Sequence, residues 1–88
     1  MSALVVAGHA YSCVRGSDVS RDGMYLELSE MEGKVRHIVM EIFYSDKTGD
    51  MTVQTFRDGV PLSAAEWMIA QAKELLPPVL NPETDAEQ

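Results

Sequence analysis

Residues 32–56, EGKVRHIVMEIFYSDKTGDMTVQTF, carry the clearest structural signal in the chain. Residues 35–44 and 51–56 both read as β-strands, and the sequence Asp-Lys-Thr-Gly at residues 46–49 separates them. Aspartate suits the first corner of a type I turn, and glycine suits the left-handed position that closes it. This stretch therefore predicts a β-hairpin.

Both faces of the first strand in this hairpin carry large apolar side chains. Strand alternation predicts one face made of Val35, His37, Val39, Glu41 and Phe43. It predicts a second face made of Arg36, Ile38, Met40, Ile42 and Tyr44. A strand exposed to water on one side would alternate more cleanly, so we expect both faces to be covered, the second by the N-terminal segment, another copy or a partner. The alternative is a small domain that leaves some apolar surface exposed.

A helix is predicted directly behind the hairpin. Ser63 is placed to cap it, Glu66 completes a capping box, and Leu62 can pack against Trp67. The proline pair at residues 77–78 ends it. The apolar stripe that we expect to lie on the sheet is Ala65, Met68, Ile69, Ala72, Leu75 and Leu76.

The remaining segments complete an α+β domain. Residues 24–31 alternate as an amphipathic strand, and residues 3–7 and 10–15 form one bulged strand or two short ones. We predict a meandering antiparallel sheet of four strands, or five, followed by one C-terminal helix packed on one face. Residues 1–80 are expected to form a single domain, and residues 81–88 an acidic flexible tail.

The charge balance restricts the partners. The chain has 88 residues, with 14 acidic and 7 basic side chains and a net charge of −7. Such a chain is repelled by phosphate backbones and anionic membranes, and could approach a basic surface on another protein. The charge could also serve solubility alone. Cys13 is a lone cysteine and no signal peptide or membrane span is apparent, so we expect a cytoplasmic protein.

No catalytic, metal-binding or cofactor-binding motif is present in the sequence. His9 and His37 lack a two-ligand spacing, and on one extended strand His9 and Cys13 would be about 13 Å apart, too far for one to activate the other. We therefore predict no enzymatic activity, no metal and no cofactor.

Two candidate surfaces remain. Aromatic and basic residues on or near the hairpin could bind a nucleic acid or a protein partner: Tyr25, Lys34, Arg36, Phe43, Tyr44 and Arg57. The alternative is that these charges only solvate strand edges and turns. Apolar residues of the second sheet face and the helix could form a dimer or partner surface: Ile38, Met40, Ile42 and Trp67.

The order of motifs across residues 25–76 resembles the transcriptional positive cofactor four family. The similar motifs are residues 29–35, 41–44, 48–51, 58–63 and the pair Glu66-Trp67. The resemblance implies a four-stranded antiparallel sheet with a C-terminal helix, a dimer, and single-stranded DNA bound through basic and aromatic side chains. Lys34, Phe43 or Tyr44, and Arg57 match the family's contact positions. Met40 and Asp58 stand where the family has arginine and lysine, which implies weak affinity for DNA.

The sequence therefore favours a small non-enzymatic module that acts by binding a protein as a homodimer. An inhibitor or immunity-type protein that covers a basic site is one form of such a module. The alternative is a single-stranded DNA-binding regulator.

Overall fold

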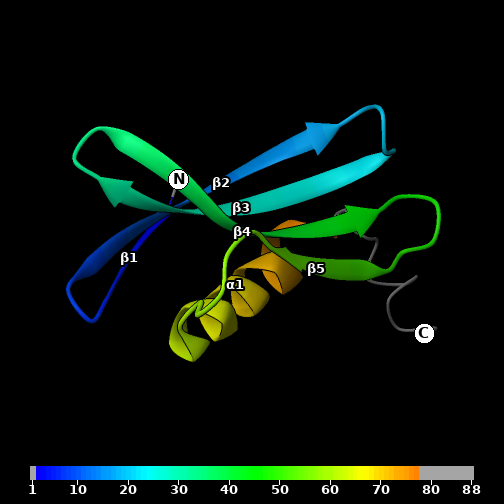
Figure 1. Cartoon of the computed structure of the whole chain (residues 1–88). Helices are drawn as coiled ribbons and strands as arrows, with labels where there is room; N and C mark the ends of the chain where they lie inside the picture. The colour runs from blue at the N-terminus through cyan, green and yellow to red at the C-terminus, as the bar shows by residue number, and fades with distance from the viewer. Residues whose placement is uncertain (1, 78–88) are drawn as a thin grey trace.

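The structure, a computed structural model, describes residues 2–77 and consists of a five-stranded antiparallel sheet and one helix. The sheet order is β1-β2-β3-β4-β5, so each strand pairs with the next one in the chain, and the helix α1 lies on one face (Figure 1). The elements are β1 Ser2–Val6, β2 His9–Asp18, β3 Gly23–Glu32, β4 Val35–Ser45, β5 Met51–Thr55 and α1 Leu62–Leu75. The predicted fold class is confirmed, with the N-terminal segment forming two strands. The predicted tail, residues 81–88, lies outside the described residues.

Tight turns explain why consecutive strands pair. In the β4–β5 turn Gly49 has a φ of 78° and its N–H donates to the Ser45 carbonyl at 2.8 Å, as the sequence predicted for this hairpin. The β1–β2 turn consists of Ala7 and Gly8, with φ values of 51° and 80°. Two consecutive positive φ values are typical of a type I′ turn, whose twist matches that of the flanking strands.

A β-bulge in β4 changes which residues share a face. Leu28 pairs with Met40 and Ser29 pairs with Ile38, so Val39 has no opposite residue in β3. Val39 and Met40 are consecutive, yet both are fully buried in the same core. The simple alternation predicted for this strand therefore holds on each side of Val39 but not across it, because the extra residue exchanges the two faces.

The core lies between α1 and one face of the sheet. Leu28 at the centre of β3 is fully buried, and Met68 and Ala72 of α1 are buried against this face. Met40 and Ile42, predicted at a dimer or partner surface, are only 1% and 2% exposed and belong to this core. That prediction is wrong for both residues, because they pair with Leu28 and Leu26 on the face that α1 covers, and the bulge puts only Ile38 on the opposite face.

The start of α1 differs from the prediction. The N-cap residue is Pro61, whose carbonyl accepts the Ala65 N–H at 3.0 Å, and no side chain caps the helix. Ser63 lies two residues after the N-cap and therefore inside the helix, and Leu62 is exposed rather than packed on Trp67. The buried stripe is Ala64, Met68, Ala72 and Leu76, so Ile69 is left at the border of the buried face.

The opposite sheet face is covered only by its own side chains in the part of the chain that the structure describes. The Arg21 guanidinium lies 4.2 Å from the Phe43 ring centroid and donates to both carboxylate oxygens of Glu41. Tyr25 lies over Gly16, where a Cβ atom would be 2.4 Å from the Tyr25 ring. These contacts explain how Glu41 is only 8% exposed on a face without a helix.

Candidate functional site

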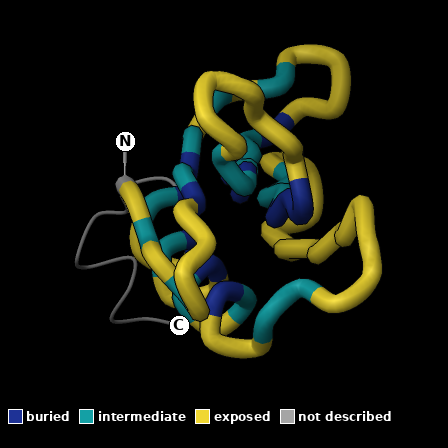
Figure 2. The backbone as a smooth tube through the Cα atoms, turned by 60° about the vertical axis from the view of Figure 1, so that its left-hand side comes forward, coloured by how far each residue is buried: buried dark blue, intermediate teal, exposed yellow. Residues whose placement is uncertain are grey.

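The edge strand β5 is the most exposed regular element of the structure. All five of its residues are exposed, whereas α1 and the other strands for which burial is described each contain buried or half-buried residues (Figure 2). It pairs with β4 on one side only. Its sequence, Met-Thr-Val-Gln-Thr, contains no charge and no proline. Edge strands usually carry charged residues or proline, which prevent pairing with other chains, so β5 lacks this protection against pairing.

The backbone hydrogen bonds show which residues of this edge are unpaired. The Asp50 carbonyl accepts from Ser45 at 3.0 Å, and the Phe56 N–H donates to Val39 at 2.9 Å, so both point towards β4. Antiparallel pairing alternates with a period of two residues. It follows that Thr52 and Gln54 also bond to β4, and that Met51, Val53 and Thr55 direct their backbone groups outward.

An apolar groove lies beside this edge on the helix side of the sheet. It encloses about 230 Å³ and is lined by Ile42, Met51, Val53, Ile69, Ala72 and Lys73. Val53 is 56% exposed, Ile69 is 41% exposed and Met51 is 37% exposed. The unpaired edge and the groove together form what we call the β5 surface: Met51, Val53, Thr55 and Ile69.

The predicted aromatic and basic residues do not form one surface. Register pairing places Tyr25 beside Phe43 on the face opposite α1, and Arg36 lies on this face as the partner of Met31. Tyr44 instead packs against the core on the helix side. Lys34 lies in the β3–β4 turn, and Arg57 lies in the connection from β5 to α1.

The remaining candidates for a dimer surface are also separated. Ile38 is 45% exposed on the face opposite α1. Trp67 is half-buried on α1 and packs against the core. The two side chains therefore lie on different sides of the sheet, and only Ile38 keeps the exposed position that was predicted.

Several cations are already bound by carboxylates. Hydrogen bonds to Glu41 and Asp18 raise the pKa of Arg21 above its ordinary value, and the same contact with Arg21 lowers the pKa of Asp18. Arg57 is bound by Glu30. These groups would have to exchange a protein carboxylate for a phosphate before they could bind a nucleic acid.

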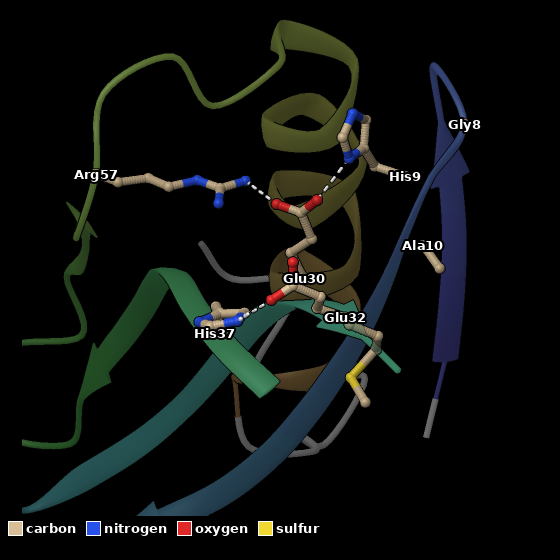
Figure 3. A pocket seen from close by; sticks show the side chains of 8 residues that line it. Gly8, His9, Ala10, Glu30, Glu32, His37 and Arg57 are labelled. Carbon is tan, nitrogen blue, oxygen red and sulfur yellow. Dashed lines mark hydrogen bonds and ion pairs between the residues drawn. The ribbon is translucent and has the colours of Figure 1, made fainter. Parts of the chain in front are cut away.

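A polar cleft of about 570 Å³ lies where the start of β2, the end of β3 and the start of β4 meet (Figure 3). In it the Glu30 carboxylate lies between Arg57 and His9, with His9 Nδ1 at 2.5 Å from Glu30 Oε2. His37 Nε2 is 3.2 Å from Glu32 Oε1. His9 and His37, which are far apart in the sequence, therefore line the same cleft.

Glu30 is the residue of this cleft that sequence reasoning missed. The alternation that put Leu26 and Leu28 on the buried face of β3 puts Glu30 on that face as well, and a carboxylate there needs a partner. Its side chain is only 17% exposed. That position in the strand pattern was the signal that could have identified it.

The chemistry available in the cleft is that of ion pairing. Within residues 2–77, no group of three histidine, cysteine, aspartate or glutamate side chains is placed to hold a metal ion. Cys13 is buried, and burial raises the pKa of its thiol, which keeps it in the poorly nucleophilic protonated form. The ion pairs of Glu30 with His9 and Arg57 instead link β2, β3 and the connection to α1.

Comparison with protein-family models, curated proteins and solved structures finds no match to this chain. Among the described residues, no helix is long and apolar enough to cross a membrane. The function must therefore be inferred from the geometry of the β5 surface and of the polar cleft.

The ion pairs of Glu30 predict a specific pH dependence of stability. Arg57, and to a smaller extent His9, hold the pKa of Glu30 below its ordinary value of 4.5. A carboxylate with a lowered pKa in the folded state stabilises the protein above its unfolded pKa, and this contribution is lost as the pH falls through the folded pKa. We expect wild type to be more stable than Glu30→Gln at pH 7, with the difference shrinking as the pH falls below 4.5.

Urea unfolding followed by circular dichroism between pH 7 and pH 3 measures this difference. Glu66→Gln is the matched control, because it removes the same charge from the exposed side of α1. A Glu30→Gln difference that stays constant with pH would contradict the role assigned to the Glu30 ion pairs.

Proposed function

We propose that this protein is a non-enzymatic protein-binding module that binds an extended polypeptide segment along β5. The observation that carries the proposal is the outward-facing, unpaired backbone of Met51, Val53 and Thr55 in a strand without charge or proline. Strand addition of this kind gains affinity from main-chain hydrogen bonds and specificity from pockets for alternate side chains.

The groove supplies the second part of such a site. The side chains of Met51, Val53 and Thr55 share the helix side of the sheet, because they pair with Tyr44, Ile42 and Met40 of β4. An added strand would place every second side chain on this same side, next to Ile69. Burying these exposed apolar groups would favour binding by about 25 cal/mol for each Å² removed from water.

Charge favours a protein over a nucleic acid as the partner. The protein has a net charge of −7, and Arg21 and Arg57 are held by carboxylates. Affinity for nucleic acids comes largely from basic side chains that displace counterions from phosphates. A protein segment needs no such cations, and Asp50, directly before β5, would favour a segment with a basic residue at one end.

Titration with a strand-like peptide tests this function. A synthetic peptide with the sequence of residues 49–57, GDMTVQTFR, is added in large excess to the ¹⁵N-labelled full-length protein. We expect the amide signals of Met51, Val53 and Thr55, and that of Ile69, to shift. A control peptide with proline in place of Val53 lacks the central N–H and should bind more weakly.

The same spectra distinguish the alternatives. Unchanged β5 signals at saturating peptide would contradict strand addition. A short single-stranded DNA at low salt serves as the second probe. Shifts at Tyr25, Phe43 and Lys34 that disappear as salt is added would favour the DNA-binding regulator instead.

A further inference from the structure

We infer that the segment bound at β5 is β5 of a second copy of this chain, so that two sheets join into one through an antiparallel β5–β5 pair. This inference rests on the proposed function and identifies the partner of the same surface. The two copies would be related by a two-fold axis that passes beside Val53.

The unpaired backbone groups are spaced for this arrangement. With the axis at Val53, Val53 faces Val53 of the second copy, and Met51 faces Thr55 of the second copy. All three residues direct their N–H and C=O groups outward, so each pair can exchange hydrogen bonds in both directions. A register shifted by two residues would leave one outward residue of each copy without a partner, so the Val53-centred register satisfies the most backbone groups.

The side chains are also self-complementary. In the antiparallel pair, Met51 and Val53 of both copies lie on the helix side, where each copy leaves an apolar groove open. The two helices would lie on the same face of the joined sheet, with Ile69 of each copy at the border of its groove. Val53, Met51 and Ile69, each more than a third exposed in the single chain, would lose much of that exposure.

Charge at the strand ends favours the antiparallel orientation. Asp50 precedes β5 and Arg57 follows it by two residues. Antiparallel pairing places Asp50 of one copy beside Phe56 of the other, whereas a parallel alignment would place Asp50 beside Asp50. Because Glu30 already binds Arg57, the advantage of the antiparallel orientation is that it avoids this repulsion between carboxylates. The strand itself contributes no repulsion, because it carries no charge.

The other edge of the sheet is less suited to this role. The side chains of Leu4 and Val6 in β1 already pack against the protein's own core. Pairing of β1 with β5 of another copy would join two different surfaces and would extend into an open filament rather than a closed dimer. Pairing of β5 with itself closes after two copies.

Disulfide trapping of the register tests the inference. Thr52 and Gln54 bond to β4 of their own chain, so across the axis they would form a non-hydrogen-bonded pair with Cα atoms about 4.5 Å apart. This separation lies within the range of a disulfide bond. We expect Thr52→Cys mixed with Gln54→Cys to give a disulfide-linked dimer under mild oxidation. Either variant alone should give little disulfide-linked dimer, because its two cysteines would not lie opposite each other in the paired strands.

Light scattering after size exclusion measures the association itself. Wild type is expected at twice the mass of one chain, and Val53→Lys, which sets two ammonium groups face to face at the axis, should weaken association about tenfold or more. Val53 is 56% exposed, so this variant should fold normally. Gln71→Lys, a half-buried position of α1 outside the β5 surface, is the charge-matched control.

The outcomes separate this inference from the proposed function. A protein that is monomeric at all concentrations but still binds the β5 peptide would overturn the second copy as partner and would leave strand addition by another protein. A dimer that gives no mixed disulfide, or that is unaffected by Val53→Lys, would overturn the β5–β5 interface. A mass that rises with concentration beyond that of two chains would indicate pairing of β1 with β5 and would also overturn the β5–β5 interface.

Discussion

Replacement of Gly23 by alanine is expected to destabilise the protein by about 3 kcal/mol or more. A Cβ atom at this position would lie 2.1 Å from the backbone carbonyl oxygen of Tyr44 and 2.5 Å from the Phe43 ring. Neither group can move freely, because the Tyr44 backbone belongs to β4 and the guanidinium of Arg21 stacks on the Phe43 ring. The substitution therefore forces apart β3 and β4 at the start of β3.

Urea unfolding of the Gly23→Ala variant measures this loss, and Gly33→Ala provides the control. Gly33 has a φ of 62° but no atom within 4 Å of an added Cβ, so its replacement adds backbone strain without a steric clash. That strain is worth about 1–2 kcal/mol. If the two variants were equally stable, close packing at Gly23 would not be the reason for glycine at this position.

Replacement of Leu28 by alanine is expected to cost about 3–4 kcal/mol, within the range for large-to-small changes in a rigid core. Leu28 is fully buried, and its register partners are Cys13 in β2 and Met40 in β4. The central position leaves little room for neighbouring strands to close the cavity. A domain of this size has a total stability of roughly 4–13 kcal/mol, so the change should move the unfolding midpoint far towards low urea.

Leu62→Ala is the matched control for this prediction. It removes the same atoms from a side chain that is 74% exposed in the first turn of α1. We expect a change below about 0.5 kcal/mol. A similar loss of stability in both variants, measured by urea unfolding, would contradict the placement of Leu28 at the centre of the core.

The β4–β5 hairpin was predictable because its turn has a local cause. Glycine at residue 49 supplies the positive φ that ends the turn, and the flanking segments contain enough β-branched and aromatic residues to form strands. The helix was predictable for a similar reason, since its apolar residues recur at helical spacing. Its first residue was not, because Pro61 serves as the N-cap through its backbone conformation and not through a side chain.

The β4 bulge was not predictable from the pattern of the strand. Val39 reads as an ordinary strand residue, and a period-two assignment therefore put Ile38 on the same face as Met40 and Ile42, whereas it lies on the opposite face. The bulge depends on pairing with β3, where Leu28 and Ser29 face residues that are two positions apart. Such a register shift is a property of two strands together, so neither strand contains the information alone.

The candidate surface shows the same limit. Residues 51–55 read clearly as a strand, and the last strand of the predicted meander is an edge, but the sequence pattern does not show which apolar side chains beside that edge α1 leaves exposed. The order of the strands makes it an edge, and the position of α1 leaves Met51, Val53 and Ile69 exposed beside it. The polar cleft likewise depends on the fold, because His9, Glu30 and Arg57 come from three separate segments.

Amide hydrogen exchange along β5 tests the role of this strand most directly. The amides of Thr52 and Gln54, which bond to β4, should be protected at every protein concentration and serve as the internal reference. The outward amides of Met51, Val53 and Thr55 are predicted to become protected as the concentration rises, or when the peptide of residues 49–57 is added. Rapid exchange of the Val53 amide under all of these conditions would show that β5 remains a free edge and would contradict its role as the binding surface.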